Sequence, residues 1–369
     1  MDYKVRFVNY PEHYRRIWSE ITGSLSECLA HGDLIMRKQT EQFEANLADF
    51  IGVEHAIGLN SGTDALFFSL KAAGIGPGDE VITVSHTFVA TIAAVHYCGA
   101  KPVLVDIGDD MNMDIETIKY SISPRTKAII PVHLNGRMCD MDKIQEIAND
   151  NDLAIIEDAA QSLGASCSGK SAGSIGLTGC FSFYPAKILG CAGDGGAVAT
   201  NDDKTADLIR LMRDHGYRRE TGEILLYGYN SRLDNIQAAM LDIKLKYLPQ
   251  WIKRRREIAE KYNSALKNIS EIQLPPKPDN SGKYFDVFQN YVIRSSGRDT
   301  LRQYLQKEGI ETLVSWPVPT HHHRALGLYD HSLPVTEKIS KEVISLPLFP
   351  ELEDAGVDYV ISSLKNYFK

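Results

Sequence analysis

Short apolar runs rich in β-branched residues alternate with amphipathic segments between about residues 40 and 215. The apolar runs predict strands over residues 80–84, 102–106, 127–133, 153–158, 180–184 and 197–200. The amphipathic segments predict helices over residues 40–50, 63–73, 88–97, 141–149 and 205–215. Strands that are apolar on both faces and separated by helices indicate a largely parallel sheet with helices covering both faces.

The pattern changes after about residue 235. Apolar residues recur at helical spacing from Ile236 to Tyr262, and Pro249 interrupts this segment, so we expect a long helix with a kink near the proline. Farther on, residues 291–293 indicate a strand and residues 299–308 indicate a helix. A chain of 369 residues can bury a large core. We therefore predict a large domain over residues 1–245 and a smaller α+β domain over residues 246–369.

The predicted strand over residues 153–158 ends in an acidic residue. Ligands of mostly parallel sheets bind at the carboxyl ends of the strands, which is where Asp158 falls. An ionised carboxylate at the end of a strand buried on both faces needs a partner. A protonated pyridinium nitrogen would be such a partner, and a strand-end aspartate that caps the following turn is the ordinary alternative.

Lys187 follows the predicted strand over residues 180–184, in a loop of small residues that continues through residues 193–196. A lysine by itself indicates little, because most lysines are solvated surface groups. Pyridoxal phosphate, however, needs a lysine amine that bonds to its aldehyde and an acid that pairs with its ring nitrogen. Lys187 and Asp158 together therefore indicate this cofactor, with Lys187 as the general base and acid of the reaction.

A phosphate site is indicated by residues 60–66, which follow the short apolar piece His55–Leu59 and open a helical pattern. Ser61 or Thr63 can cap that helix, and Gly62 lets the backbone approach a ligand closely. The free amides and the positive end of the helix dipole then favour a phosphate dianion. An ordinary helix cap has the same sequence signature, but agreement with the two preceding motifs favours the phosphate.

Two further residues fit the same cofactor. Ser182 could add a hydroxyl group to the phosphate site, although a serine buried in a strand is the ordinary alternative. Phe88 opens a predicted amphipathic helix and could cover one face of the cofactor ring by offset stacking. An aromatic residue at such a spacing is more often part of the core.

Three consecutive histidines at positions 321–323 resemble a metal-binding tract. Consecutive side chains rarely all face one ion, and the sequence shows no second group of ligands, so we expect no metal here. The run lies between a proline-rich segment and Arg324. It is more typical of a loop that offers cations to an acidic substrate such as a diphosphate.

Composition indicates in which compartment the protein lies and which classes of partner it lacks. The net charge of −8 has its signs interspersed, which argues against a nucleic-acid surface. The basic run over residues 253–256 fits a solvated helix face. The six cysteines show no metal-ligand spacing and indicate reduced thiols in a cytoplasmic setting. The N-terminus lacks the apolar core of a signal peptide and no apolar run reaches about 18 residues, so we expect no membrane association.

Ordered motifs resemble the DegT/DnrJ/EryC1/StrS family of pyridoxal-phosphate-dependent nucleotide-sugar aminotransferases. They are Ser-Gly-Thr-Asp-Ala-Leu at residues 61–66, Gly-Asp-Glu-Val at 78–81, Glu-Asp-Ala-Ala-Gln at 157–161, Ser-Phe-Tyr-Pro-Ala-Lys at 182–187 and Asn-Ser-Arg-Leu-Asp-Asn-Ile-Gln-Ala-Ala at 230–239. The similarity runs from about residue 30 to the C-terminus. It implies the α/β fold of type I pyridoxal phosphate enzymes, like aspartate aminotransferase, with a large, mostly parallel sheet domain and a smaller α+β C-terminal domain.

The resemblance implies a role for each matched residue of the cofactor site. Lys187 would hold pyridoxal phosphate, Asp158 would pair with its ring nitrogen, and Gln161 would contact its ring hydroxyl. Phe88 would stack on the ring. The residues that would bind the phosphate are Gly62, Thr63 and Ser182.

The resemblance also implies partners. Asn230 matches a residue that reaches the phosphate from the other subunit, so an obligate homodimer with shared active sites is implied. Arg232 and His321 match positions that commonly face the nucleotide-sugar. The implied substrates are glutamate, as the amino donor, and a keto sugar carried on a nucleoside diphosphate.

The same motifs bear on the reaction. The form Ser-Phe-Tyr-Pro-x-Lys, followed by Gly-Asp-Gly-Gly, looks closest to family members that aminate a 3-keto sugar, and a 4-keto sugar is the alternative. Related sugar dehydratases carry a histidine in place of Lys187, which argues against that activity. A non-catalytic sensor with the same fold is a third possibility, against which the complete set of motifs argues.

Overall fold

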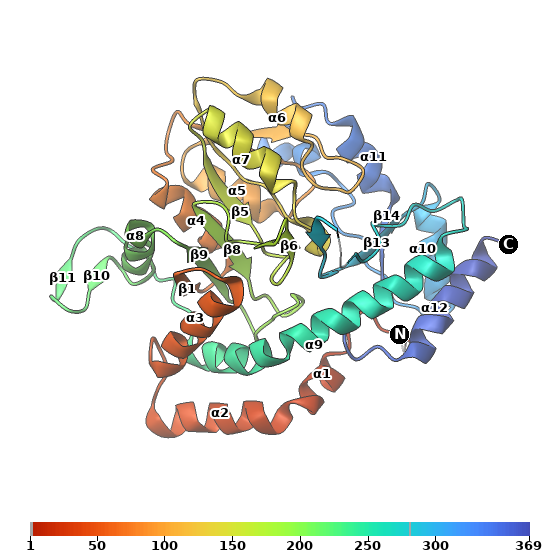
Figure 1. Cartoon of the computed structure of the whole chain (residues 1–369), viewed down its shortest axis with the longest axis horizontal. Coiled ribbons are helices and arrows are strands. Elements are labelled where there is room, and N and C mark those ends of the chain that lie inside the picture. Colours follow the sequence, from red (N-terminus) through yellow and green to blue (C-terminus); the bar gives the residue numbers. More distant parts are fainter. Residues whose placement is uncertain (1–2, 280–281) are drawn as a thin grey trace.

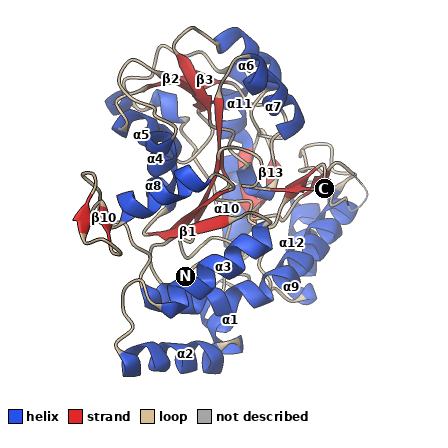
Figure 2. Ribbon diagram, turned by 60° about the vertical axis from the view of Figure 1, so that its left-hand side comes forward, coloured by secondary structure: helices blue, strands red, loops and turns tan. Residues whose placement is uncertain are grey.

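The computed structural model describes residues 3–279 and 282–369, and a seven-stranded sheet forms the centre of its larger part (Figures 1 and 2). The strand order is β1-β9-β8-β5-β4-β2-β3. The strands are β1 (His55–Leu59), β2 (Glu80–Val84), β3 (Lys101–Val105), β4 (Thr126–Ile129), β5 (Ala154–Asp158), β8 (Thr178–Ser182) and β9 (Gly196–Thr200). Neighbouring strands pair in parallel except that β9 runs antiparallel to both β1 and β8. The predicted, largely parallel sheet is confirmed.

Helices cover both faces of this sheet, as predicted. They include α3 (Lys38–Ile51), α4 (Gly62–Ala72), α5 (Val89–Tyr97), α6 (Ile115–Ser121), α7 (Met141–Asp150) and α8 (Asp203–Arg213). The N-terminal helices α1 (Tyr10–Arg16) and α2 (Trp18–His31) lie outside these layers, with α2 against the later helix α9 (Asn235–Leu266) (Figure 1). Successive strand residues enter different apolar clusters: Ile82 of β2 packs with side chains of α3 and α7, whereas Val81 packs with those of α4, α5 and α8. Both faces of the sheet are therefore buried, which is why its strands are apolar throughout.

The long helix α9 (Asn235–Leu266) continues through Pro249 and runs diagonally across the molecule in Figure 1. It is followed by α10 (Arg298–Lys307), α11 (Pro334–Glu342) and α12 (Asp354–Tyr367), with β13 (Tyr291–Arg294) and β14 (Val343–Leu346) paired antiparallel. A separate apolar cluster joins the second half of α9 to α10, α12, β13 and β14. The predicted domain division at residues 245 and 246 stays a prediction, because α9 passes through it.

Smaller elements lie around this framework. They are β6 (Ser166–Cys167), β7 (Lys170–Ser171), β10 (Tyr217–Arg218), β11 (Glu223–Ile224), β12 (Tyr284–Phe285) and the short 3-10 helices η1 (Leu134–Gly136), η2 (Thr320–His322) and η3 (Arg324–Leu326). The β10–β11 hairpin projects from the side of the molecule in both ribbon views (Figures 1 and 2).

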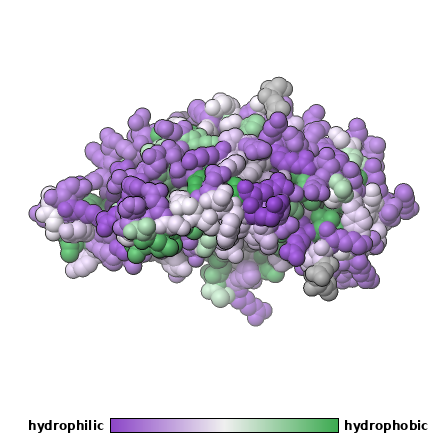
Figure 3. Space-filling model, turned by 90° about the horizontal axis from the view of Figure 1, so that it is seen from below, coloured by the Kyte–Doolittle hydropathy of each residue, from purple (hydrophilic) through white to green (hydrophobic). Residues whose placement is uncertain are grey.

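One face of the molecule is largely polar (Figure 3), and the cysteines lie in the interior. In the face shown in Figure 3, hydrophilic residues predominate and apolar residues form separate patches. All six cysteines are buried and carry free thiols. Among the described residues, no helix has the length and apolar character needed to cross a membrane.

The predicted strand over residues 127–133 is interrupted in the structure. β4 ends at Ile129, and Ile130 makes one more hydrogen bond, from its N–H to the carbonyl oxygen of Ile82 at 2.8 Å. Pro131 then follows, and a proline has no N–H with which to continue the ladder. Beyond the proline the segment pairs with β5 again, because the N–H of Asp158 donates to the carbonyl oxygen of Pro131 at 2.9 Å and the N–H of His133 donates to that of Asp158 at 3.0 Å. The predicted segment therefore follows the sheet to its end, although regular strand geometry stops at Ile129.

Candidate active site

A cavity of about 520 Å³ opens at the carboxyl edge of the central sheet. Its walls come largely from the loops that follow β1, β2, β4, β5 and β8. Carboxyl ends of parallel strands meet at one edge of a sheet, so segments far apart in the sequence converge there. The cavity brings together the predicted residues Gly62, Thr63, Phe88, Asp158, Gln161, Ser182 and Lys187.

Lys187 lies in the loop after β8, on the wall of the cavity. Its backbone N–H donates to the carbonyl oxygen of Tyr184 at 2.8 Å, which closes a tight turn. Burial lowers the pKa of Lys187 below its ordinary value, and the attraction of the Asp158 carboxylate opposes this effect without cancelling it. The amine is therefore more readily neutral, and so more nucleophilic, than that of a solvated lysine.

Asp158 ends β5 and is 5% exposed. Its Oδ2 accepts a hydrogen bond from Thr91 Oγ1 at 2.8 Å, and its Oδ1 accepts one from the N–H of Ala160 at 3.2 Å. Burial raises the pKa of Asp158, against the effect of these hydrogen bonds and of the Lys187 charge. A cation placed against this carboxylate would favour its ionised form, which is what a protonated ring nitrogen would do.

The residues of the predicted phosphate site lie at the N-terminus of α4. Ser61 is the cap, because its Oγ accepts a hydrogen bond from the N–H of Asp64 at 3.1 Å. A β-carbon at Gly62 would lie 2.8 Å from Cβ of Ser182, and one at Gly196 would lie 2.3 Å from the carbonyl carbon of Ser61. The backbones of α4, β8 and β9 thus approach each other as closely as glycine allows. With the helix dipole behind them, Ser61, Gly62 and Ser182 fit a phosphate dianion.

Gln161 and Phe88 supply the remaining cavity contacts that were predicted. Gln161 Oε1 accepts a hydrogen bond from the N–H of Asn135 at 2.8 Å, so the amide nitrogen is the donor that this side chain can offer to a ligand. Phe88 precedes α5 and is 60% exposed although it lines the cavity. Such exposure rules out a core residue and suits stacking on a planar ligand.

Three predicted residues do not line this cavity. Asn230 is exposed beside the β10–β11 hairpin, and Nη1 of Arg232 donates to Oδ1 of Asp214 at 2.9 Å. His321 is fully buried and hydrogen-bonded to Ser85 at 2.7 Å. The roles of these residues in substrate and cofactor binding stay predictions.

Comparison with known proteins agrees with this geometry. The family model described as the DegT/DnrJ/EryC1/StrS aminotransferase family matches residues 15–365. The chain belongs to this family. The fold and the enzyme class predicted from the sequence are confirmed by that match and by the solved structures that resemble this aminotransferase.

The curated relatives and solved structures cover almost the whole aminotransferase chain. The "Pleiotropic regulatory protein" of Geobacillus stearothermophilus is 40% identical over 370 residues, which is 99% of each chain. The "UDP-2-acetamido-2-deoxy-3-oxo-D-glucuronate aminotransferase" of Pseudomonas aeruginosa is 39% identical over 363 residues, 98% of this chain and 100% of that one. The crystal structure of S. venezuelae DesV in complex with a ketimine intermediate is 39% identical with a TM-score of 0.95, covering 99% of this chain and 98% of that one.

Two residues that support the aminotransferase site were not predicted from the sequence. Gln289 holds the backbone on both sides of Lys187, and it lies about 100 residues farther along the chain. Thr91 lies in the first turn of α5 and donates a hydrogen bond to the carboxylate of Asp158, which ends a strand far along the chain. The spacing between Phe88 and Thr91 places both on one side of a helix, which is a weak signal for Thr91. No local signal marks Gln289.

Glu157 is a third supporting residue, fully buried next to Asp158. Its carboxylate accepts hydrogen bonds from the N–H groups of Gly173, Ile175 and Gly176 at 2.7–2.9 Å, and it lies 2.9 Å from Nε2 of His133. These bonds fasten the loop before β8 to the end of β5. The two adjacent carboxylates therefore have different roles. Glu157 binds the backbone of the loop before β8, whereas Asp158 lines the cavity.

Proposed function

We propose that this aminotransferase uses pyridoxal phosphate to transfer an amino group from glutamate to the 3-keto group of a sugar carried on a nucleoside diphosphate. The observation that carries the proposal is the meeting of Lys187 and Asp158 in one cavity with the capped N-terminus of α4. The names of relatives support the substrate class, because the Pseudomonas aeruginosa protein is named for a 3-oxo sugar linked to UDP.

The fit of the residues to the cofactor rests on three features of the cavity. Lys187 would hold the cofactor through its amine, and Asp158 would pair with the ring nitrogen while Thr91 fixes the carboxylate. The close approach of Gly62 to Ser182 leaves a backbone cradle for the phosphate. Bound pyridoxal phosphate supplies an electron sink for the carbon that gains or loses the amino group.

The reaction also needs a group that moves a proton at that carbon. Lys187 is placed for this role, because burial lowers the pKa of its amine and the amine faces the cavity. Nζ would take up the proton from the donor carbon in the first half of the reaction and deliver a proton to the sugar carbon in the second. The buried walls limit the access of water to the reacting atoms.

The proposal includes a homodimer with shared active sites. Asn230 and Arg232 follow the projecting β10–β11 hairpin. Large apolar side chains are exposed in and just after this hairpin, because Ile224 of β11 is 74% exposed and Tyr227, in the segment that follows, is fully exposed. A second copy of the chain would cover these apolar groups. In that arrangement, Asn230 would reach the phosphate, and Arg232 would reach the nucleotide-sugar, in the partner's cavity.

The first test is the visible absorption spectrum of the protein reconstituted with pyridoxal phosphate, recorded before and after addition of glutamate. We expect a visible band that disappears with glutamate, and amination of a UDP- or dTDP-linked 3-keto sugar when that sugar is then supplied. Lys187→Ala should lose both effects, whereas Lys170→Ala, at an exposed lysine, should retain them. Wild-type turnover by Lys187→Ala would contradict the proposal.

The name of the Geobacillus stearothermophilus relative raises a regulatory function as the second candidate. The same experiment separates the two functions. A regulator that binds the cofactor without catalysis would show the visible band and no response to glutamate or to any keto sugar of a panel that includes 4-keto sugars. Amination of a 4-keto sugar in preference to a 3-keto sugar would keep the enzyme class and correct the acceptor.

A further inference from the structure

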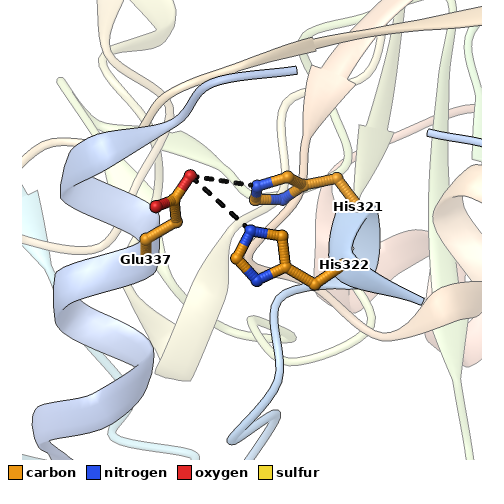
Figure 4. Close-up of side chains that lie close together, drawn as sticks. All are labelled: His321, His322 and Glu337. Carbon is orange, nitrogen blue, oxygen red and sulfur yellow. Dashed lines mark hydrogen bonds and ion pairs between the residues drawn. The ribbon is translucent and has the colours of Figure 1, made fainter. Parts of the chain in front are cut away.

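Two of the three consecutive histidines face a glutamate on another helix. His321 and His322 lie in η2, and Glu337 lies in α11; Figure 4 shows both imidazole rings turned towards the Glu337 carboxylate. One ligand atom from each residue can be chosen so that all three lie within 4.8 Å of one another. The sequence indicated no metal here because the third ligand comes from a separate helix, after the intervening η3 segment.

The distances in this cluster differ from those of ordinary hydrogen bonds. Nε2 of His321 is 3.4 Å from Oε1 of Glu337, and Nε2 of His322 is 3.7 Å from the same oxygen. Hydrogen bonds between N–H and oxygen are usually about 2.7–3.2 Å long. Ligand atoms bound tetrahedrally to one ion at about 2.0–2.1 Å are separated by about 3.3–3.5 Å, which is close to both observed distances.

Contacts with Ser85 orient the buried ring of His321. Nδ1 of His321 is 2.7 Å from Oγ of Ser85, and the same oxygen accepts a hydrogen bond from the backbone N–H of His321 at 3.2 Å. Metal-bound histidines commonly use their second ring nitrogen in this way, which leaves the first nitrogen to face the ion. The contact with Ser85 therefore directs Nε2 of His321 towards Glu337.

The helix that carries Glu337 is fastened as well. The N–H groups of Val335 and Thr336 donate to the carboxylate of Asp106, which follows β3, at 2.9 and 2.8 Å. His321 is fully buried, whereas the side chains of His322 and Glu337 are 44% and 32% exposed. The cluster thus has a rigid inner side and an open outer side through which an ion and its water can enter.

We propose that His321, His322 and Glu337 bind a divalent first-row transition metal ion, with zinc as the best match. Two imidazoles and one carboxylate suit zinc, which accepts three protein ligands and leaves a fourth position for water. Magnesium and calcium prefer sites made of oxygen ligands. The ion would join η2 to α11 and so stabilise the segment that carries Trp316, which lines the active-site cavity. The proposal does not depend on the proposed aminotransferase reaction.

The test is titration of zinc chloride into the cofactor-loaded protein, free of any affinity tag and of bound metal, followed by isothermal calorimetry. We expect one zinc ion to bind per chain, with magnesium chloride giving no saturable signal. His322→Ala and Glu337→Gln should each weaken zinc binding more than about tenfold. Glutamine keeps an oxygen that can accept the N–H of Leu333, so Glu337→Gln preserves the start of α11.

His323→Ala is the matched control, because His323 is an exposed neighbour outside the cluster. It should bind zinc like the wild-type protein. Zinc should also raise the thermal unfolding midpoint of the wild-type and His323→Ala proteins but not that of His322→Ala. Absence of saturable binding by the wild-type protein would overturn the proposal, as would binding by His322→Ala and Glu337→Gln that equals the wild type.

Discussion

Gln289 forms hydrogen bonds with the backbone on both sides of Lys187. Its Oε1 accepts a hydrogen bond from the N–H of Ile188 at 2.6 Å, and its Nε2 donates to the carbonyl oxygen of Ala186 at 2.8 Å. Gln289 is 7% exposed and immediately precedes the segment that enters β13. The position of Lys187 is therefore set partly by the C-terminal third of the chain.

Replacement of the Gln289 side chain tests whether its two hydrogen bonds position the Lys187 loop. Gln289→Met keeps the approximate volume but removes both hydrogen bonds, so the buried N–H of Ile188 loses its partner. We expect the free energy of unfolding to fall by about 1–3 kcal/mol and the turnover number to fall as the Lys187 loop loosens. Gln303→Ala, at an exposed position of α10, should change neither quantity. Unchanged turnover in Gln289→Met would show that the loop keeps its geometry without this contact.

The close approach of Gly196 to the backbone of Ser61 gives a second prediction. A β-carbon there would lie 2.3 Å from the carbonyl carbon of Ser61 and 2.6 Å from the nitrogen of Gly62, both of them backbone atoms. Gly196→Ala should therefore displace the start of α4 and abolish the retention of pyridoxal phosphate through gel filtration. Gly76→Ala is the control, because no heavy atom of the described residues lies within 4 Å of its added carbon. Wild-type cofactor content in Gly196→Ala would disprove the assigned phosphate cradle.

The hydroxyl of Thr91 supports Asp158 and gives a third prediction. Thr91→Val removes the 2.8 Å hydrogen bond to Oδ2 of Asp158 while keeping the shape of the side chain. Because hydrogen bonds to the ionised form lower the pKa of a carboxyl group, we expect the pKa of Asp158 to rise further and its pairing with a ring nitrogen to weaken. Turnover should fall about threefold to tenfold.

Thr91→Ser serves as the rescue variant, because serine keeps the hydroxyl group. It should restore turnover and the pH dependence of the visible absorption band. A structural role of the threonine methyl group would give the opposite order, with Thr91→Val close to the wild type and Thr91→Ser impaired. Comparison of the two spectra as a function of pH therefore distinguishes the positioning of Asp158 from the packing of α5.

The contiguous parts of the site could be predicted because each motif directly follows a buried strand. Residues 61–63 follow β1, Asp158 ends β5, and Lys187 follows β8. A parallel sheet brings the ends of such strands together whatever their separation in the sequence. Local composition was therefore sufficient to predict that the lysine, the carboxylate and the N-terminus of α4 meet in one cavity.

The supporting contacts could not be predicted in the same way. Gln289 and Glu337 reach their partners through tertiary packing, and neither has a local pattern that distinguishes it from a surface residue. Helix α2 was also missed, since only Ile21 and Cys28 of its residues are buried and its apolar periodicity is correspondingly weak. Predictions from one sequence succeed where burial leaves a regular pattern, and they fail where a single side chain bridges two segments.

The last prediction concerns stability in acid and the buried His86. This ring is 2% exposed, its Nδ1 lies 3.2 Å from Oγ of Ser340, and it packs edge-on against Trp316. Burial, with a smaller contribution from the Arg294 charge, lowers the pKa of His86 from 6.5 to about 4. Between these two pH values the unfolded chain binds more protons than the folded chain does, so the free energy of unfolding falls as the pH falls.

The size of this effect follows from the shift in pKa. A change in the pKa of His86 from 6.5 to about 4 lowers the free energy of unfolding by on the order of 3 kcal/mol. This loss is complete once the pH is below about 4. His86→Gln removes the titrating group and keeps a partner for Ser340. Urea unfolding at a series of pH values from 7 to 4 should therefore show a shallower loss of stability in this variant than in the wild type.

His96→Gln is the control for that series, because His96 is exposed on α5. Its stability should follow the wild-type pH dependence. The carboxyl groups of the protein titrate over part of the same range in all three proteins, so the difference between slopes isolates His86. Parallel curves for the wild type and His86→Gln would mean that the buried ring gains its proton without unfolding, through water or a carboxylate that reaches it in acid.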